Sequence, residues 1–372
     1  MEALKLAQKI GGHIEIKGKV RLSKKTLPIL YTPGVAKVAL AVAADKSLAS
    51  RLTFKKNSVA IISDGSAVLG LGNIGPEGAL PVMEGKALLF KALADIDAVP
   101  LVLATQDTEE IIKIVKALAP TFGGINLEDI SAPRCFEIEE RLIDELDIPV
   151  MHDDQHGTAV VVLAALLNAL RVVGKHLDKA KIVIVGAGAA GCAVALLLLN
   201  AGAGDIILVD SRGIVSCGRL DLNAPKRELA EKTNQRKIAG PMKEAVIGAD
   251  VLIGVSKANL FSLELIKSMT KDPIVFALAN PTPEIMPNLA RQAGAAIVAT
   301  GRSDFPNQIN NVLGFPGIFR GALNNHVKKI TMEMKLAAAK KLAGLVKRPN
   351  IKNILPSPFD KRVVKTIAKV IC

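Results

Sequence analysis

Short apolar runs alternate with helical patterns along most of this chain, and that alternation restricts the folds that it can adopt. The first series of runs covers 59–63, 99–104, 123–127 and 148–152, with helical patterns near 80–94, 108–118 and 134–146. The second series covers 182–185, 206–209, 251–255, 274–278 and 296–299. Continuous apolar strands separated by helices form parallel sheets that are covered on both faces. We therefore predict an α/β chain of two units, linked by a helix at Thr158–Val173 and ending in further helices.

Length and composition are typical of a globular protein. The chain has 372 residues, of which 50% are hydrophobic, and a chain of this length makes about two domains. No apolar run reaches the ~18 residues of a membrane span, and the first residues lack the apolar stretch of a signal peptide. The four cysteines are scattered and form no CxxC pair. We expect reduced thiols, a cytoplasmic location and no membrane partner.

The net charge of +13 raises the question of a nucleic-acid partner. The excess is largest near the C-terminus, where residues 328–372 hold 12 Lys and Arg against Glu333 and Asp360. These basic residues recur as on solvated helix faces, and the chain has one tyrosine and no tryptophan to stack on bases. We therefore expect no nucleic-acid partner, and a surface that attracts small anionic substrates.

One segment has the pattern of a dinucleotide-binding turn. A short apolar strand is followed by Gly186, Ala187, Gly188, Ala189, Ala190 and Gly191, and a helical pattern begins there. The first glycine permits the tight turn, the second lets a pyrophosphate approach the helix N-terminus, and the third permits close packing of helix on strand. Asp210 ends the next strand, 24 residues after Gly186, and its carboxylate can bind ribose hydroxyls. We predict NAD as the cofactor, with NADP as the alternative.

Two details refine this prediction. Asp210 would repel the 2′-phosphate of NADP, whereas Arg212 could turn toward that phosphate, so we expect NAD to be preferred. A second run, Gly70 to Gly75, matches the same glycine pattern, but no strand-terminal acid follows at the right distance and Pro76 breaks the chain. We interpret that run as a loop on the substrate side.

Acidic residues follow all four strands of the first series. Asp64, Asp107, the pair Glu128 and Asp129, and the pair Asp153 and Asp154 lie at or just past the strand ends. That edge of an open α/β sheet binds ligands, although single acids there also cap helices. The doubled pairs favour a site for a hard ion, Mg²⁺ or Mn²⁺; the alternative is zinc held by His152 and His156, four residues apart. A metal together with a hydride acceptor points to oxidation of a chelating hydroxy acid.

Three other residue types have two interpretations each. Lys86 shares a helical stripe with Leu89, Phe90 and Leu93; desolvation there lowers a lysine pKa, as a general base requires, unless the side chain extends to water. Tyr31 lies between Pro28 and Pro33 and is either a proton donor or a packing residue. The asparagines after the later strands are either substrate and nicotinamide ligands or ordinary turn residues; they are Asn280, Asn310 and Asn311.

Several longer motifs, taken in order, resemble those of the malic enzyme family. They are LYTPGVA, SDGSAVLGLGNIGPEGALPVMEGKALLFK, INLEDISAPRCFEIE, HDDQHGTA, GAGAAG, FALANPTPE and SDFPNQINNVLGFPGIFRGAL. The resemblance is to the compact prokaryotic form and extends from about residue 10 to residue 360. It implies an N-terminal malic domain for substrate and metal at 1–152, and a Rossmann-type NAD(P)-binding domain with a C-terminal helical segment at 153–372. It also implies a homodimer.

The activity that this resemblance implies is oxidative decarboxylation of (S)-malate to pyruvate and CO₂, with NAD or NADP and with Mg²⁺ or Mn²⁺. Matched by position, Lys86 is the general base, Tyr31 the proton donor and Asp153 the residue that orients the base. The implied metal ligands are Glu128, Asp129 and Asp154. The implied contacts to substrate and nicotinamide are Lys86, Asn280 and Asn310.

One position departs from the larger eukaryotic form, which has an arginine where this chain has Ala67. We expect the malate carboxylate to find another partner, either loop amides near Ser66 or a neighbouring subunit. Two alternative functions remain: a malolactic-type decarboxylase, which releases lactate, and a catalytically silent nucleotide-binding protein.

Overall fold

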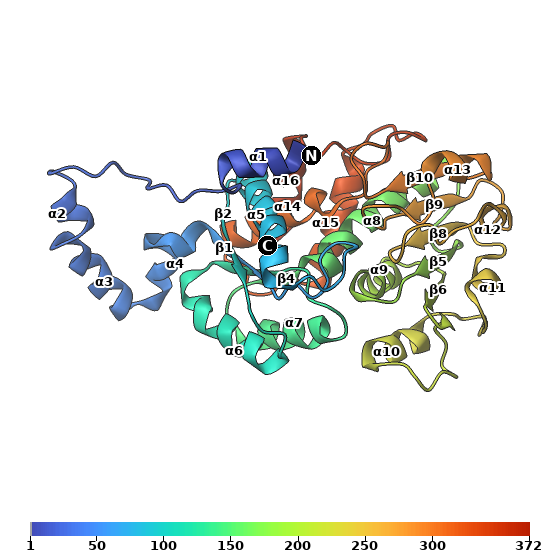
Figure 1. Ribbon diagram of the computed structural model, residues 1–372, viewed down its shortest axis with the longest axis horizontal. Coiled ribbons are helices and arrows are strands. Elements are labelled where there is room, and N and C mark those ends of the chain that lie inside the picture. The colour runs from blue at the N-terminus through green and yellow to red at the C-terminus, as the bar shows by residue number, and fades with distance from the viewer. Residues whose placement is uncertain (1) are drawn as a thin grey trace.

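The computed structural model describes residues 2–372 and contains two β-sheets that lie side by side (Figure 1). The first sheet has the order β2-β1-β3-β4 and all its strand pairs are parallel. Its strands are β1 (Ser58–Ser63), β2 (Asp97–Val102), β3 (Gly124–Leu127) and β4 (Val150–His152). The helices between them are α5 (Gly75–Ala94), α6 (Thr108–Leu118) and α7 (Arg134–Glu145). The four predicted strands of the first series are therefore all present.

The second sheet has six strands in the order β10-β9-β8-β5-β6-β7. They are β5 (Lys181–Val185), β6 (Asp205–Asp210), β7 (Gly213–Ile214), β8 (Val251–Gly254), β9 (Ile274–Ala277) and β10 (Ile297–Thr300). The helices of this unit are α9 (Ala189–Asn200), α10 (Ala224–Lys232), α11 (Met242–Val246), α12 (Leu263–Lys267) and α13 (Pro287–Gln292). The doubly wound α/β architecture is confirmed. The sequence pattern missed β7, because a two-residue antiparallel strand leaves no periodic signal.

Helix α8 (Asp153–Val173) lies between the two sheets and begins directly after β4. It is apolar around its whole circumference, as expected of a helix buried on all sides, and it packs against α9 and α15. The sequence pattern placed its start at Thr158, whereas the helix begins five residues earlier at Asp153. Asp153 and Asp154 therefore lie in its first turn, where the helix dipole favours negative charge.

The C-terminal helices are α14 (Phe315–Asn324), α15 (Met332–Gly344) and α16 (Arg362–Ala368). Although they follow the second unit in sequence, α14 packs against α5 and β3 of the first unit. Phe90 of α5 makes edge-to-face contacts with Phe315 and Phe319, with ring centroids 4.7 and 5.5 Å apart. The chain thus returns to cover its first sheet. The short 3-10 turns are η1 (Lys46–Leu48), η2 (Phe54–Asn57), η3 (Ala119–Thr121) and η4 (Asn311–Leu313).

Residues 14–52 form an arm that extends away from both sheets and contains α2 (Leu27–Leu30), α3 (Gly34–Ala44) and α4 (Ala49–Leu52) (Figure 1). Helix α1 (Glu2–Ile10) instead lies over α5, where the His13 N–H donates to Glu84 Oε2 at 3.0 Å. These four helices contain no buried residue. Two stretches are long and apolar enough to cross a membrane, Leu27–Ala44 in the arm and α8. Since 67% of the α8 window is buried, α8 is a core helix, and the arm stretch is interrupted at Pro33 between α2 and α3.

Candidate active site

The two predicted acidic pairs meet at one edge of the first sheet. Strands β3 and β4 are neighbours, and Leu127 is paired with His152 in their register. Glu128 and Asp129 continue from Leu127, and Asp153 and Asp154 continue from His152. The backbone N–H of Asp129 donates a hydrogen bond to Asp154 Oδ2 at 2.8 Å, so the pairs are in direct contact.

Three of these acids form a group that fits a divalent cation. One ligand oxygen from each of Glu128, Asp129 and Asp154 lies within 4.8 Å of the others. Asp129 has φ +54°, an uncommon backbone conformation for a residue other than glycine. Its buried Oδ2 has no hydrogen-bond partner. Burial and the nearby Asp154 and Glu128 carboxylates raise the pKa of Asp129 to about 9. Crowded carboxylates with a free oxygen are the donor set that Mg²⁺ and Mn²⁺ prefer.

Lys86 of α5 adjoins this group and is buried. Its Nζ donates to Glu128 Oε1 at 2.6 Å and to Asp153 Oδ2, and it lies 4.2 Å from the centroid of the Phe315 ring. Burial lowers its pKa, but the Asp153 and Glu128 carboxylates outweigh burial, and the pKa is raised. The sequence prediction of a lowered pKa is wrong, because the apolar stripe gave no sign of these two partners. The alternative of a side chain extended to water is also wrong.

The Asp153 carboxylate, which accepts a hydrogen bond from Lys86, lies against the backbone of Gly157. A Cβ at Gly157, one helical turn later, would overlap with Asp153 Oδ1. Asp153 Oδ1 is buried without a partner, whereas Oδ2 accepts from Lys86. Burial raises the pKa of Asp153 well above its usual value. The predicted role of orienting the base is compatible with this geometry.

The histidines of the HDDQH motif are not members of the three-carboxylate group, although His152 Nε2 lies 3.7 Å from Asp154 Oδ2. His156 Nε2 hydrogen bonds with Glu139 Oε2 at 3.0 Å. Glu139, a buried residue of α7, also accepts from the His152 backbone N–H at 2.7 Å and from Gln155 Nε2 at 2.9 Å. The group of candidate ligands among residues 2–372 contains no histidine, so the geometry does not favour zinc. Sequence reasoning missed Glu139, although an acid among the core positions of an amphipathic helix is a usable signal.

The remaining two acidic strand ends have other roles. Asp107 caps α6 by accepting a hydrogen bond from the Glu110 N–H at 2.8 Å, so the capping interpretation holds there. Asp64 forms an ion pair with Arg134 at 3.0 Å and accepts from the Ser66 N–H at 2.9 Å. The Ala67 N–H donates to the Asp129 carbonyl. The loop amides expected to bind the malate carboxylate are therefore already engaged, that of Ser66 within its own loop and that of Ala67 by the segment after β3.

The predicted dinucleotide turn has the expected backbone. Gly186 has φ +114°, and a Cβ at Gly191 would overlap with the Gly186 carbonyl, so helix and strand approach as closely as glycine allows. A Cβ at Gly188 would meet open space at the N-terminus of α9, where a pyrophosphate approaches. Asp210 ends β6, beside the turn, since Val209 is paired with Val185.

The predicted asparagines lie on loops near these groups. The Asn280 turn contacts the substrate-side loop, since a Cβ at Gly70 would overlap with the Asn280 carbonyl oxygen. Asn310 caps η4 by accepting from the Val312 N–H at 2.9 Å, which leaves its amide hydrogens available. The neighbouring Asn311 lies beside Gly157 of α8. The two loops therefore approach the acidic edge from the second unit.

Tyr31 is the one predicted catalytic residue that a single chain does not bring to the site. It ends α2 on the arm, and its side chain is 67% exposed. Helices α2 and α3 pack chiefly on each other and on η1 and α4. Within residues 2–372, the cluster around Lys86 thus lacks its predicted proton donor.

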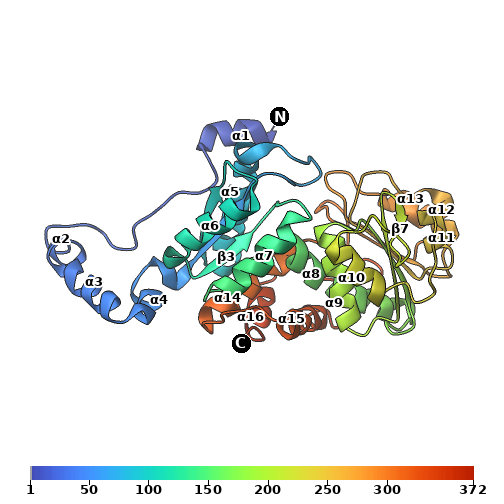
Figure 2. The ribbon, with the colours of Figure 1, turned by 90° about the horizontal axis from the view of Figure 1, so that it is seen from below.

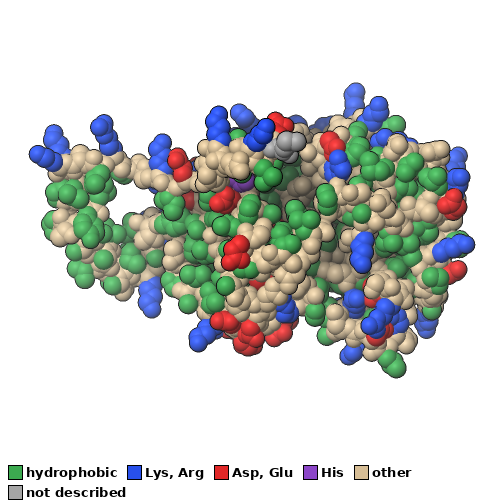
Figure 3. Space-filling view, in the orientation of Figure 1, with side chains coloured by type: hydrophobic (Ala, Val, Ile, Leu, Met, Phe, Trp, Pro, Cys, Tyr) green, Lys and Arg blue, Asp and Glu red, His purple; other side chains and the backbone are tan. Residues whose placement is uncertain are grey.

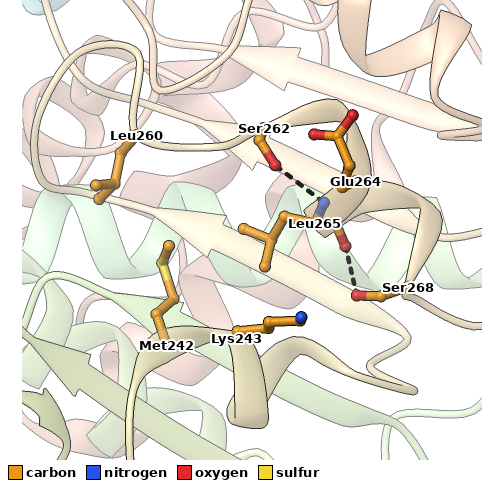
Figure 4. Close-up of a pocket in the computed structure, with 7 residues that line it drawn as sticks. All are labelled: Met242, Lys243, Leu260, Ser262, Glu264, Leu265 and Ser268. Atoms are coloured by element: carbon orange, nitrogen blue, oxygen red, sulfur yellow. Dashed lines mark hydrogen bonds between the residues drawn. The ribbon is translucent and has the colours of Figure 1, made fainter.

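A separate pocket of about 370 Å³ lies in the second unit (Figure 4). It is lined by Met242, Lys243, Leu260, Ser262, Glu264, Leu265 and Ser268. None of these residues was predicted to be functional, and the Ser262 and Ser268 hydroxyls form hydrogen bonds within α12. The predicted site residues all lie outside this pocket.

Comparison with known proteins decides the family. Residues 12–143 match the model of the malic enzyme N-terminal domain, and residues 155–371 match that of the malic enzyme NAD-binding domain. The chain belongs to the malic enzyme family. It is 55% identical to the NAD-dependent malic enzyme of Geobacillus stearothermophilus, over 97% of this chain and 76% of that protein. It is 52% identical to the bifunctional malic/malolactic enzyme of Bacillus subtilis, over 100% and 91%.

A solved structure extends this relationship to the whole fold. The NAD-dependent malic enzyme of Thermotoga maritima matches with a TM-score of 0.96 and 50% identity, covering 100% of this chain and 99% of that one. The predicted malic enzyme fold and NAD(P)-dependent decarboxylating malate dehydrogenase activity are confirmed. The malolactic alternative is not favoured over this activity.

Proposed function

We propose that this malic enzyme converts malate to pyruvate and CO₂ at the edge formed by β3, β4 and the start of α8. The observation that carries the proposal is the buried group of Glu128, Asp129 and Asp154, in contact with Lys86 through Glu128. We place the boundary between the malic domain (1–152) and the NAD(P)-binding domain (153–372) where α8 begins. A cytoplasmic location is supported by the free cysteines Cys135, Cys192, Cys217 and Cys372.

Glu128, Asp129 and Asp154 are the residues that hold Mg²⁺ or Mn²⁺, and the orphaned Asp129 oxygen supports this assignment. A bound divalent ion supplies positive charge that lowers the pKa of the C2 hydroxyl of malate and favours anionic species during decarboxylation. Residues 186–191 and Asp210 would hold NAD or NADP on the second unit, and the bound cofactor would supply the hydride acceptor.

Lys86 carries out the proton transfer at C2. Its ammonium is held by Asp153 and Glu128, which fixes the position of the side chain. The unpartnered Asp153 Oδ1 offers an additional acceptor for orienting the amine. Lys86 must be neutral to accept the hydroxyl proton. The positive charge of a divalent ion beside the carboxylates would lower the pKa of Lys86, so that the neutral amine forms more easily at neutral pH.

Two asparagines complete the substrate contacts in this proposal. Asn310 donates its free amide hydrogens to the malate carboxylate, which replaces the engaged amides of Ser66 and Ala67. Asn280 lies between the substrate-side loop and the NAD(P)-binding domain, and it contacts both substrate and nicotinamide. The polar lining explains specificity for a small dicarboxylate, since a site built to hydrogen bond rejects ligands that lack those groups.

Tyr31 reaches the site from a second copy of the chain. The arm exposes many large apolar side chains, which gather as a patch in Figure 3; they include Val20, Leu22, Leu27, Ile29, Leu30, Tyr31, Val35, Val38, Leu40 and Leu52. Apolar patches of this kind mark interfaces, and pairing of identical arms gives a two-fold homodimer. In that dimer Tyr31 of one protomer protonates C3 of the enol at the site of its partner.

The decisive experiment supplies purified enzyme with (S)-malate, Mn²⁺ and either NAD or NADP, and follows cofactor reduction and the product. We expect pyruvate to form in a 1:1 ratio with reduced cofactor. The same assay compares Asp154→Asn, which alters a candidate metal ligand, with Asp107→Asn as its matched control, because Asp107 caps a helix at the same sheet edge. Lactate without net cofactor reduction would establish the malolactic alternative, and nucleotide binding without turnover of malate would establish the silent one.

A further inference from the structure

Glu139 of α7 is a buried acid that the proposed mechanism does not use. Helix α7 lies beside the start of α8 (Figure 2), and the Glu139 carboxylate bonds to that start. Its Oε1 accepts from the His152 backbone N–H at 2.7 Å. Its Oε2 accepts from Gln155 Nε2 at 2.9 Å and hydrogen bonds with His156 Nε2 at 3.0 Å. All three partners belong to residues 152–156, the segment that also carries the second acidic pair.

The start of α8 is capped by this acid from another helix. His152 is the N-cap residue, and its side chain makes no capping hydrogen bond. In a capping box, a Glu or Gln at the third helical position accepts a hydrogen bond from the backbone N–H of the N-cap residue. Gln155 occupies that position, but Glu139 accepts the His152 N–H and Gln155 donates to the same carboxylate. Glu139 therefore fixes the first turn of α8 in place of a local cap.

The charge of Glu139 is compensated within the protein. Burial opposes ionisation, but the contact with His156 and the positive charge of Lys335, a buried lysine of α15, lower the pKa of Glu139 to about 2. Glu139 is therefore ionised at neutral pH, and both of its oxygens act only as acceptors. The three groups that face it can all donate, so an ionised carboxylate satisfies each of them.

The turn that Glu139 fixes carries two residues of the candidate site. Asp154 belongs to the three-carboxylate group and accepts the Asp129 N–H at 2.8 Å. Asp153 accepts a hydrogen bond from Lys86. Because both acids lie in the first turn of α8, a shift of that turn would move the candidate metal ligand and the partner of the base together.

We propose that Glu139 is a positioning residue of this enzyme, and that it holds the first turn of α8 so that Asp154 meets the divalent ion and Asp153 meets Lys86. This inference rests on the proposed function, because it concerns the metal and the base of that reaction. Glu139 acts only through the residues of that turn. Partners that hold metal ligands in place typically contribute about 10- to 100-fold to metal affinity or activity.

The central test is Glu139→Gln, with Mn²⁺ affinity measured by titration calorimetry on enzyme without nucleotide or malate. Glutamine keeps the volume but replaces one acceptor oxygen by an amide group that faces other donors, so the Mn²⁺ Kd should rise about tenfold. Glu140→Gln is the matched control, because it makes the same change at the adjacent, exposed residue of α7, and it should leave the Kd unchanged. An unchanged Kd in folded Glu139→Gln would overturn the inference and leave the proposed function intact.

A milder variant keeps the test decisive if Glu139→Gln does not fold. Gln155→Met removes one of the three bonds to Glu139 and keeps a side chain of similar length. The Mn²⁺ Kd should rise roughly threefold, the scale of one hydrogen bond. An unchanged Kd in this variant would contradict the inference.

Steady-state kinetics separates positioning from a general loss of stability. In Glu139→Gln a displaced Asp154 should raise the KM for Mn²⁺ and a displaced Asp153 should lower kcat. The KM for NAD at saturating Mn²⁺ should equal that of the wild type, because the glycine turn belongs to the other sheet. A lower Tm with unchanged kcat and unchanged KM for Mn²⁺ would indicate a merely structural acid and contradict the inference. If the wild type binds no Mn²⁺ and oxidises no malate, the proposed function and this inference both fail.

Discussion

The two acidic sites of this enzyme lie at the carboxyl ends of parallel strands, yet their charges are balanced in opposite ways. At the end of β3, four carboxylates surround one cation, Lys86, and buried oxygens of Asp129 and Asp153 have no partner. At the end of β6, Asp210 and Asp221 are matched by three cations and every oxygen of Asp210 is bonded. The pKa of Asp129 is raised to about 9, and that of Asp210 is lowered to about 2.

The difference in charge balance indicates which kind of ligand each site can bind. A carboxylate group that lacks positive charge is costly to bury, and that cost is relieved by a cation from outside the chain. A carboxylate that is saturated by internal donors has no such need, and a ligand must compete with those donors. The first arrangement favours the binding of a cation, and the second does not.

The largest expected effect comes from removing the single cation of the β3 site. Lys86→Ala should lower kcat for malate oxidation by about 10²- to 10⁴-fold, because a proton transfer is lost. Lys91→Ala is the control, since Lys91 is on the same helix but pairs with Asp95 and Asp97 at the surface. Steady-state kinetics with Mn²⁺ and NAD measures both variants. A kcat near that of the wild type in Lys86→Ala would show that this lysine is not the base.

The next largest effect is expected from removal of the divalent cation or of one of its ligands. Chelation should abolish activity, and Asp154→Asn should weaken Mn²⁺ binding by about 10- to 100-fold, the loss that follows disturbance of a metal site. Titration calorimetry of Mn²⁺ into the enzyme without nucleotide gives the affinity, with Asp107→Asn as the matched control. Full malate oxidation in metal-free buffer would contradict this difference between the two sites, because the β3 site would then be active without a bound cation.

Mixing two inactive variants tests whether the β3 site is completed by a second chain as well as by a metal. When Tyr31→Phe and Lys86→Ala protomers are unfolded, mixed and refolded together, half of the dimers should be hybrids with one intact shared site. About a quarter of wild-type activity should therefore return. If Tyr31 acts within its own chain, no hybrid site is intact and no activity returns. Refolding each variant alone provides the baseline.

The smallest effects are on stability, and they should have opposite signs at the two sites. Asp129→Asn should raise the stability of the metal-free enzyme at pH 8 by about 1–3 kcal/mol, because Asp129 must take up a proton when the chain folds at that pH and asparagine need not. A raised folded-state pKa means that wild-type stability is lost as pH rises from about 4 to 9, so this gain should vanish near pH 4. Asp210→Asn should lower stability at pH 7, and since the folded pKa is about 2, the loss should disappear as pH falls through that value.

Melting temperatures with chelator, measured from pH 2 to pH 9, give both effects. Excess Mn²⁺ should reverse the order of wild type and Asp129→Asn, because only the wild type gains binding energy. If both substitutions changed Tm in the same direction, the proposed difference in charge balance between the β3 site and the β6 site would be contradicted.

Much of this molecule was predictable from periodicity. Parallel strands leave continuous apolar runs of a few residues, and the carboxyl-end rule then places Glu128, Asp129, Asp153 and Asp154 at one edge. What the pattern did not show depended on contacts distant in sequence. Lys86 meets Glu128 and Asp153, which are 42 and 67 residues away, so its pKa moved opposite to the prediction from its own helix.

Other differences have the same origin. Asp210 was treated as a free carboxylate because Arg219 and Lys226 lie in a loop and a short helix without periodic signal. Glu139 looked like an ordinary helix acid until the start of α8 was placed against it. Tyr31 was identified through the resemblance of its motif to the malic enzyme family. Within one chain it lies on the arm, away from Lys86.

The contact between Gly70 and the carbonyl oxygen of Asn280 has a mechanical consequence. Here the malic domain and the NAD(P)-binding domain touch mainly through backbone, with the Pro281 ring beside the contact. Backbone cannot adopt another rotamer, so this contact acts as a rigid end-stop for any closing movement of the two halves. The gap between the two halves at this point is thereby set by main-chain atoms. One added methyl at residue 70 would wedge the halves apart and lengthen that gap, although every catalytic group remained in place.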